Sequence, residues 1–363
     1  MKHCKDLKIM INLKKLETCL LLNSGFKREL DPHGASDLKV TSLTQVEKGA
    51  MIDLYFFSVN YSIGSLNKKK ELVLKFFHET NGHVICSREF QVMSHLEKTG
   101  FPVPKVYLAE RRDDVLGSPF LIMNREKPMP GFVFKDSDWV TFAKTLANLH
   151  NYDASEFGNA LAYPKDAYSF AERSVNQIRG SINEIKLSHQ LKSSFEIAAR
   201  WLQRHVYSVS CPKYCLLHGD YHPENILFNI NSKMMILDWD WAEIGDPACD
   251  LGYTYHSLKF FCDYRNPSSA DDVAEHFVSE YLKNFKGDVL PRLKFYKLIG
   301  ALRIAVMATR VLSNPVVAYK YLGPKALFGF PFLEQPLARR WLNSEKELVR
   351  VKYFEDFVEA NYG

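Results

Sequence analysis

The sequence lacks several features that would place it in a common functional class. No apolar run approaches 18 residues, so no membrane-spanning segment is predicted. Seven cysteines occur at scattered positions without CxxC spacing, which argues against a zinc site and predicts a reduced, cytoplasmic protein. No small-residue cleavage site follows the short apolar run at 20–22, so a secretory signal peptide is not predicted either.

Basic charge is scarce outside the first 30 residues. The formal net charge is +5, and residues 1–30 contain seven Lys or Arg against three Asp or Glu. The rest of the chain is nearly neutral, whereas a nucleic-acid binder needs a basic surface on its folded body. The basic stretch at 5–23 predicts an amphipathic helix with Ile9, Leu13, Leu16 and Leu20 on one face. We expect this face to pack on its own domain; binding to a membrane or a partner is the alternative.

A chain of 363 residues with 46% hydrophobic content is long enough for two domains with separate cores. Strand-like runs at 38–44, 51–60, 71–77, 101–107 and 117–123 predict a β-rich first part, with the lysines at 68–70 in a solvated turn. Proline and glycine at 127–131 then break any regular element. Beyond them helices are predicted at 139–150, 191–208, 271–285, 291–312 and 344–361, while 151–190 has no clear pattern.

A polar loop between two apolar runs, at 216–228, carries Asp220 and Asn225 five positions apart. A further apolar run ends at Asp238, 18 residues after Asp220. Phosphoryl transfer requires a carboxylate to receive a hydroxyl proton, and an amide and a second carboxylate to hold Mg²⁺ on the phosphates. Kinases place these groups in this order and at about this spacing. The alternative is a pair of ordinary strand-end turns, where Asp and Asn are common.

A lysine and a glutamate interrupt two apolar patterns. Lys75 lies in the strand-like run 71–77, which is apolar on both faces, and Glu89 lies on the apolar stripe of a helix expected at 84–99. A buried charge needs a partner, because desolvating it alone costs several kcal/mol. We therefore predict a Lys75–Glu89 ion pair. In a kinase such a pair holds the lysine on the α- and β-phosphates; a purely structural ion pair is the alternative.

The residues 218–225, 237–240 and 245–251 resemble the aminoglycoside phosphotransferase and choline kinase family of the protein-kinase-like fold. The resemblance implies an α+β, bilobal protein-kinase-like fold. An N-terminal antiparallel sheet lobe with the leading basic helix would span residues 1–124, and a larger, mainly helical lobe for catalysis and acceptor binding would span 125–363. It further implies that Asp220 is catalytic and that Asn225 and Asp238 bind Mg²⁺.

The same resemblance implies residues for ATP. Lys75, held by Glu89, would bind the phosphates, and the turn at 45–50 would cover them, although Gly49 is its single glycine before Ala50. A bland hairpin is the alternative for that turn. Backbone groups at Met123, Asn124 and Arg125 would meet adenine at the start of the connection between the lobes.

The predicted function is an ATP- and Mg²⁺-dependent phosphotransferase with a small-molecule hydroxyl acceptor and no nucleic-acid partner. Gly219 stands where protein kinases carry an Arg, and seven residues, 239–245, leave no room for a regulated activation loop, which disfavours a protein substrate. A nucleotide-binding pseudokinase or sensor is the alternative from another class. The acids Asp240, Glu243 and Asp246 suit an aminoglycoside- or choline-like cation, or act as structural caps. Residues 300–305 resemble kinase-like domains fused to acyl-CoA dehydrogenases, which would imply a hydroxy-acid acceptor.

Overall fold

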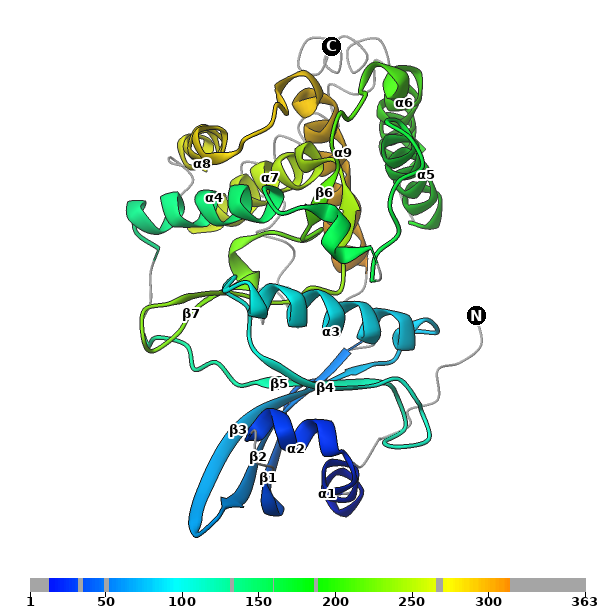
Figure 1. Cartoon of the computed structure of the whole chain (residues 1–363). Helices are drawn as coiled ribbons and strands as arrows, with labels where there is room; N and C mark the ends of the chain where they lie inside the picture. Colours follow the sequence, from blue (N-terminus) through cyan, green and yellow to red (C-terminus); the bar gives the residue numbers. More distant parts are fainter. Residues whose placement is uncertain are drawn as a thin grey trace. The chain divides into compact units, whose positions relative to one another are not determined.

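The computed structural model describes residues 13–31, 35–48, 52–130, 134–158, 160–185, 189–265 and 270–313. The chain forms two compact units (Figure 1). Unit 1 comprises residues 1–132 and 226–240, and unit 2 comprises residues 133–225 and 241–363. None of the helices in the described ranges is long and apolar enough to cross a membrane.

Unit 1 is built on an antiparallel sheet. Among the described residues the sheet has five strands in the order β1-β2-β3-β5-β4 (Figure 1). The strands are β1 Ser36–Lys48, β2 Ile52–Ile63, β3 Leu66–Phe77, β4 Val106–Glu110 and β5 Phe120–Asn124. The predicted antiparallel sheet is thereby confirmed, but the expectation of a solvated turn at 68–70 is wrong. The β2–β3 ladder continues to the pair Ile63↔Leu66, and the chain turns at Gly64, whose φ is +57°.

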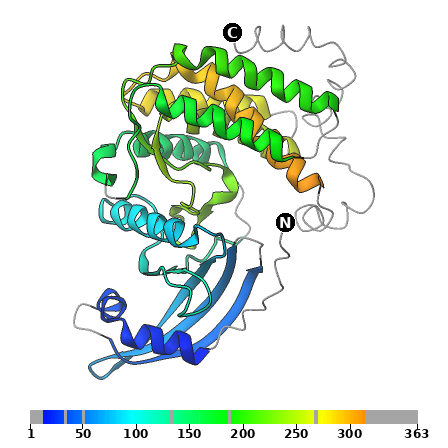
Figure 2. The same ribbon diagram turned by 90° about the vertical axis from the view of Figure 1, so that its right-hand side faces the viewer.

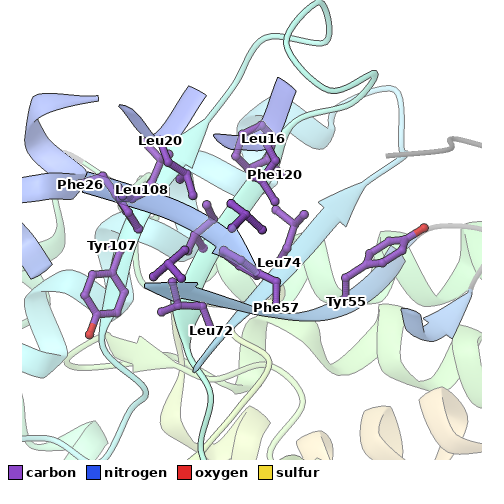
Figure 3. Packing of buried hydrophobic residues seen from close by; sticks show 14 of the residues in the cluster. Leu16, Leu20, Phe26, Tyr55, Phe57, Leu72, Leu74, Tyr107, Leu108 and Phe120 are labelled. Carbon is purple, nitrogen blue, oxygen red and sulfur yellow. The ribbon is translucent and has the colours of Figure 1, made fainter. Parts of the chain in front are cut away.

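The two faces of the sheet pack against different elements. Leu72, Leu74 and Phe76 of β3 pack in the main hydrophobic cluster of unit 1. Side chains alternate along a strand, so Lys75 lies on the opposite face. The cluster face is covered by α1 Leu13–Leu22 and α2 Ser24–Leu30, which contribute Leu16, Leu20 and Phe26 (Figure 3). Helix α3 Gly82–Lys98 packs on the opposite face.

The first part of the predicted amphipathic helix, including Ile9, lies outside the described residues. Within α1, Leu16 and Leu20 are fully buried against the sheet, as expected for the apolar stripe, while Leu13 at the start of the helix is exposed. Asn23 separates α1 from α2, and its side chain accepts a hydrogen bond of 2.7 Å from the backbone N–H of Phe26. That cap satisfies one of the free donors at the start of α2.

A short hairpin returns from later in the sequence to unit 1. It consists of β7 Ile226–Phe228 and β8 Met234–Ile236. Asn229 pairs with Pro128, and Ile236 donates its backbone N–H to the carbonyl oxygen of Pro102 at 2.7 Å. These bonds explain why the compact units differ from a simple division after residue 124: the hairpin that ends near Asp238 is hydrogen-bonded to the first part of the chain.

Unit 2 is mainly helical, as predicted. Its helices are α4 Asp136–His150, α5 Ser169–Glu184, α6 His189–His205, α7 Pro247–Arg265, α8 Ala270–Asn284 and α9 Leu290–Ser313, with short 3₁₀ turns η1 Ala154–Phe157, η2 Val206–Ser208 and η3 Pro223–Asn225. Figure 2 shows α5 and α6, in green, beside the orange α9. The segment 151–190, which shows no clear pattern in the sequence, contains α5. The helix predicted at 344–361 lies outside the described residues.

Two features of unit 2 position the candidate site. Strand β6 Cys215–Leu217 pairs with β9 Glu243–Gly245, so the chain enters the 218–225 loop from a buried strand. Helices α7 and α9 meet at Gly252 and Gly300. A Cβ on Gly300 would lie 2.6 Å from the carbonyl oxygen of Gly252, so both glycines are needed for this close approach.

Candidate active site

The predicted ion pair of Lys75 and Glu89 is present. Lys75 Nζ lies 2.8 Å from Glu89 Oε2 and 3.0 Å from Oε1. Both residues are buried, with 3% and 1% of their surface exposed. The face opposite the main cluster places Lys75 toward α3, and the stripe Ile85, Glu89, Met93 and Leu96 is the buried side of that helix. The contact follows from the two patterns; its role in binding phosphate stays a prediction.

Lys75 has a second carboxylate partner. Its Nζ lies 2.6 Å from Oδ1 of Asp238, which follows β8 and adopts φ +65°. Burial opposes the charge on Lys75, but the carboxylates of Asp238 and Glu89 outweigh it and raise the pKa of the lysine. The lysine is therefore a fixed cation. Left-handed backbone at a non-glycine residue costs energy, of order 1–3 kcal/mol, and such strain is common where a side chain must be aimed.

The residues expected at the nucleotide base are placed in part. Gly49 lies outside the described residues. Met123 lies in β5, opposite Val73 and Val106. The guanidinium of Arg125 stacks 3.9 Å over the ring of Phe56, and the backbone N–H of Arg125 donates to the carbonyl oxygen of Glu71. Their roles at adenine stay predictions.

In unit 2 the carboxylate of Asp220 is held from both sides. Tyr253 on α7 donates its hydroxyl to Oδ1 at 2.5 Å. Asn225 donates its amide nitrogen to Oδ2 at 3.0 Å, and His222 Nε2 lies 3.2 Å from the same oxygen. Burial would raise the pKa of Asp220, but these bonds and the nearby charge of Arg303 lower it well below the usual range. Asp220 is therefore ionised and fixed in orientation.

The hydrogen bonds of His222 decide its tautomer. Its Nδ1 accepts the backbone N–H of Glu224 at 3.2 Å, so the proton of the neutral ring sits on Nε2 and points at Asp220. With its proton in that position the ring donates to the carboxylate and braces the loop.

The backbone around Asp220 is clamped by α7. Asp250 accepts the N–H groups of His218 at 2.7 Å and Gly219 at 3.0 Å, and Thr254 donates to the carbonyl oxygen of Tyr221 at 2.8 Å. Burial works against the charge of Asp250, but the side chain of His150 and the N–H of His218 lower its pKa. His150 itself is buried between Asp250 and Tyr281.

Sequence reasoning missed Tyr253 and Arg303. Arg303 on α9 donates to the carbonyl oxygen of Gly219 at 2.7 Å and stacks 4.4 Å from the ring of Tyr253. The available signal was indirect. Tyr253 follows Asp250 by three residues, which is one helical turn, and Arg303 follows the contact glycine Gly300 by the same interval.

The donor groups suit Mg²⁺. Both bonds from Asn225 to Asp220 use the amide nitrogen, which leaves the amide oxygen for another partner. Asp238 is bonded to Lys75 through Oδ1, and its side chain is 39% exposed. Within the described ranges no group of three or more His, Cys, Asp or Glu could hold a metal ion. Mg²⁺ needs no such cluster, because it binds one or two protein oxygens together with substrate phosphates and water.

The antiparallel sheet with its buried Lys–Glu pair, and the helical unit with its Asp–Asn loop, define a protein-kinase-like phosphotransferase. Residues 57–296 match the phosphotransferase enzyme family, and the chain belongs to that family. Two solved structures support the fold. A protein from Ralstonia eutropha JMP134 assigned as an aminoglycoside phosphotransferase is 17% identical, covers 93% of this chain and 99% of its own, and has a TM-score of 0.57. A macrolide 2′-phosphotransferase from Brachybacterium faecium is 16% identical, covers 88% and 98%, and has a TM-score of 0.53.

Curated relatives are longer proteins. Acyl-CoA dehydrogenase family member 11 of Rattus norvegicus is 26% identical over 323 residues, which is 81% of this chain and 39% of the relative. The protein of the same name from Homo sapiens is 24% identical over 352 residues, which is 90% of this chain and 43% of the relative. The chain thus spans about two fifths of the length of the curated relatives it matches.

Proposed function

We propose that the protein is an ATP- and Mg²⁺-dependent kinase that phosphorylates a hydroxyl group of a small molecule. The observation that carries this proposal is the buried ammonium of Lys75 between Glu89 and Asp238. A fixed cation in a buried setting is costly to maintain. It is the group that a kinase needs on the α- and β-phosphates of its nucleotide.

Each residue of the proposed site has a separate role in the reaction. Lys75, held by Glu89, binds nucleotide phosphates, and the oxygens of Asn225 and Asp238 bind the metal. Bound Mg²⁺ neutralises charge on the phosphates. Asp220 orients the acceptor hydroxyl and takes its proton. The acceptor oxygen forms a bond to the γ-phosphorus, the bond from that phosphorus to the β–γ bridging oxygen breaks, and ADP leaves with the electron pair.

The ion-pair partners of two acidic residues, Asp246 and Glu243, bear on the chemical class of the acceptor. Asp246 is buried, caps α7 through the N–H of Ala248, and is bonded to Arg292 at 2.5 Å. Glu243 lies 2.6 Å from Arg173. Both therefore serve the structure, which weakens the argument for a choline- or aminoglycoside-like cation. The acyl-CoA dehydrogenase name of the curated relatives favours a hydroxy-acid-like acceptor.

The cellular setting is part of the proposal. Five cysteines of the described part of the chain, at 19, 86, 211, 215 and 249, are free thiols. Free thiols are typical of a reducing compartment, and we infer a cytoplasmic protein.

The test is a screen of ATP consumption with Mg²⁺ against hydroxy acids, their thioesters, amino alcohols and aminoglycosides, followed by mass detection of a phosphorylated product. We expect one class to raise ATP turnover at least tenfold over the acceptor-free rate. The alternative is a nucleotide sensor. Saturable Mg·ATP binding with no turnover on any acceptor would favour it.

A further inference from the structure

Tyr253 makes a contact that its place in the core does not require. The side chain is 4% exposed and lies on α7, where the ring packs under the guanidinium of Arg303. A phenylalanine would fill the same space. The hydroxyl instead donates to Asp220 Oδ1 at 2.5 Å, and burial together with the charge of Asp220 raises the pKa of the phenol. The phenol therefore stays protonated and remains a donor.

The two oxygens of Asp220 are not equivalent. Oδ1 accepts from the buried Tyr253, whereas Oδ2 is shared by longer contacts, 3.0 Å to Asn225 and 3.2 Å to His222. A carboxylate oxygen has two acceptor sites, so the two contacts fill Oδ2, whereas Oδ1 keeps a second acceptor site beside the bond from Tyr253. The side chain of Asp220 keeps 24% of its surface exposed, whereas Tyr253 is buried.

Helix α7 places Tyr253 with two backbone clamps. Asp250, Tyr253 and Thr254 stand at i, i+3 and i+4, which is one face of a helix. Asp250 holds the N–H groups before Asp220, and Thr254 holds the carbonyl oxygen after it. Arg303 holds the carbonyl oxygen of Gly219. With the backbone fixed on both sides, the remaining freedom of Asp220 is rotation of its side chain, and Tyr253 is placed to stop it.

We propose that Tyr253 is a positioning residue that holds Oδ1 of Asp220 and so fixes the orientation of the carboxylate toward the acceptor hydroxyl. This inference rests on the proposed kinase function and adds a residue to that site. Tyr253 acts through Asp220 and does not itself touch the transferred group. Its loss allows the carboxylate to rotate, and a misplacement of about 1 Å at a reacting group costs up to about 10²-fold in rate.

The kinetic test compares Tyr253→Phe with Tyr255→Phe. Tyr255 is on the same helix, and its hydroxyl donates to Glu275 at 2.7 Å. We expect Tyr253→Phe to lower kcat about tenfold or more while the KM for Mg·ATP stays within twofold, and Tyr255→Phe to leave both unchanged. Introducing Asp220→Asn into Tyr253→Phe should lower kcat less than additively. Equal kcat in the two tyrosine variants, or a Tyr253→Phe effect confined to KM or to melting temperature, overturns the proposal.

Rescue separates the hydrogen bond from packing. Replacing Tyr253 by 4-aminophenylalanine keeps a donor at the ring end, and we expect at least half of the loss in kcat to be recovered. 4-Methylphenylalanine, similar in size without a donor, should behave like Phe. Equal kcat for the two analogues overturns the proposal.

A spectroscopic test reports on the contact without turnover. 3-Fluorotyrosine at position 253 should change its ¹⁹F resonance when Asp220 becomes Asn, and the same probe at 255 should not. An unchanged resonance at 253 would show that Tyr253 and Asp220 are not in contact, and would overturn the proposal. A parent protein that shows the coupled resonance but phosphorylates no acceptor refutes the proposed function, and the catalytic role of Tyr253 falls with it.

Discussion

Lys75 and Asp238, 163 residues apart in the sequence, form an ion pair with Nζ 2.6 Å from Oδ1. Lys75 thereby binds two carboxylates at once, because Glu89 lies 2.8 Å away. The lysine predicted to bind phosphate and the aspartate predicted to bind metal are thus partners of each other in this structure. On nucleotide binding, a phosphate would replace Asp238 as the partner of Lys75, and the metal would replace Lys75 as the partner of Asp238.

The first prediction concerns the charge balance around Lys75. Lys75→Met leaves the buried Glu89 without its cation, and we expect a loss of about 3–5 kcal/mol in unfolding free energy. The double variant Lys75→Met/Glu89→Leu should recover most of that loss, because both charges are gone. Denaturant unfolding of the two variants measures the difference. Mg·ATP binding, followed by calorimetry, should be lost in both. A double variant as unstable as the sum of the single ones would contradict a direct pair.

The second prediction concerns the metal. Asp238→Asn keeps the shape of the side chain but removes the charge, so Mg²⁺ should support nucleotide binding at least tenfold less well. In the parent, ATP should bind weakly when the divalent metal is removed with a chelator. Titrating Mg²⁺ at fixed ATP measures both effects. The control is Asp53→Asn, a buried carboxylate on β2 that lies 3.3 Å from His78 and has no proposed role at the metal. Equal Mg²⁺ dependence in parent and Asp238→Asn would make the ligand assignment wrong.

The Lys75–Glu89 pair could be predicted from local sequence patterns. The stripe Ile85–Glu89–Met93–Leu96 and the doubly apolar strand around Lys75 were enough to pair Lys75 with Glu89, because a buried charge needs a partner. The Lys75–Asp238 contact was not predictable in the same way, since it depends on the return of the β7–β8 hairpin to unit 1. The lysines at 68–70 were misread because an exposed strand extension has no apolar alternation to reveal it.

The residues around Asp220 show the same limit. Asp220, Asn225 and Asp238 could be proposed from the sequence because their spacing is set by one loop and one hairpin. Tyr253 and Arg303 lie on α7 and α9, and their approach depends on the Gly252–Gly300 crossing, which spacing alone does not fix. The acids Glu243 and Asp246 looked available in the sequence, but their arginine partners, Arg173 and Arg292, lie 70 and 46 residues away.

The third prediction addresses the catalytic group. Asp220→Asn keeps the shape but cannot take a proton, and we expect Mg·ATP affinity within a few-fold of the parent and turnover lower by about 10² or more. His222→Ala removes a brace, so its effect on turnover should be smaller. Both are compared at saturating ATP with the acceptor found in the screen. A dead histidine variant beside a near-normal Asp220→Asn would transfer the role of base to His222.

The fourth prediction is a pH dependence from Asp250. Its pKa is lowered in the folded state, so the stability it contributes is complete above the unfolded value, about 3.9, and is lost as the pH falls below that value. Asp250→Asn should destabilise the protein by about 2–4 kcal/mol at pH 7, because two backbone N–H donors lose a charged acceptor. The difference from the parent should be constant between pH 8 and 5 and shrink below about pH 4. A difference that is the same at pH 7 and pH 3.5 would show that the ionised carboxylate is not what holds the loop.

The last prediction uses two glycines of unit 2. Gly219 has φ +82°, and a Cβ there would lie 2.3 Å from the carbonyl oxygen of Trp241. Gly219→Ala must therefore shift the backbone next to Asp220. Gly180, exposed on α5, has nothing within 4 Å of its added Cβ, so Gly180→Ala is the matched control.

We expect the two variants to differ in sign. Gly180→Ala should stabilise the protein by about 0.5–1 kcal/mol, because alanine loses less backbone entropy in a helix. Gly219→Ala should lower the melting temperature and reduce turnover at least tenfold, because the backbone clamped by Asp250 and Arg303 no longer fits. Mg·ATP affinity should change little in Gly219→Ala, since Lys75 and Glu89 are untouched. Turnover that stays normal in Gly219→Ala would mean that the geometry of this backbone does not control the reaction at Asp220.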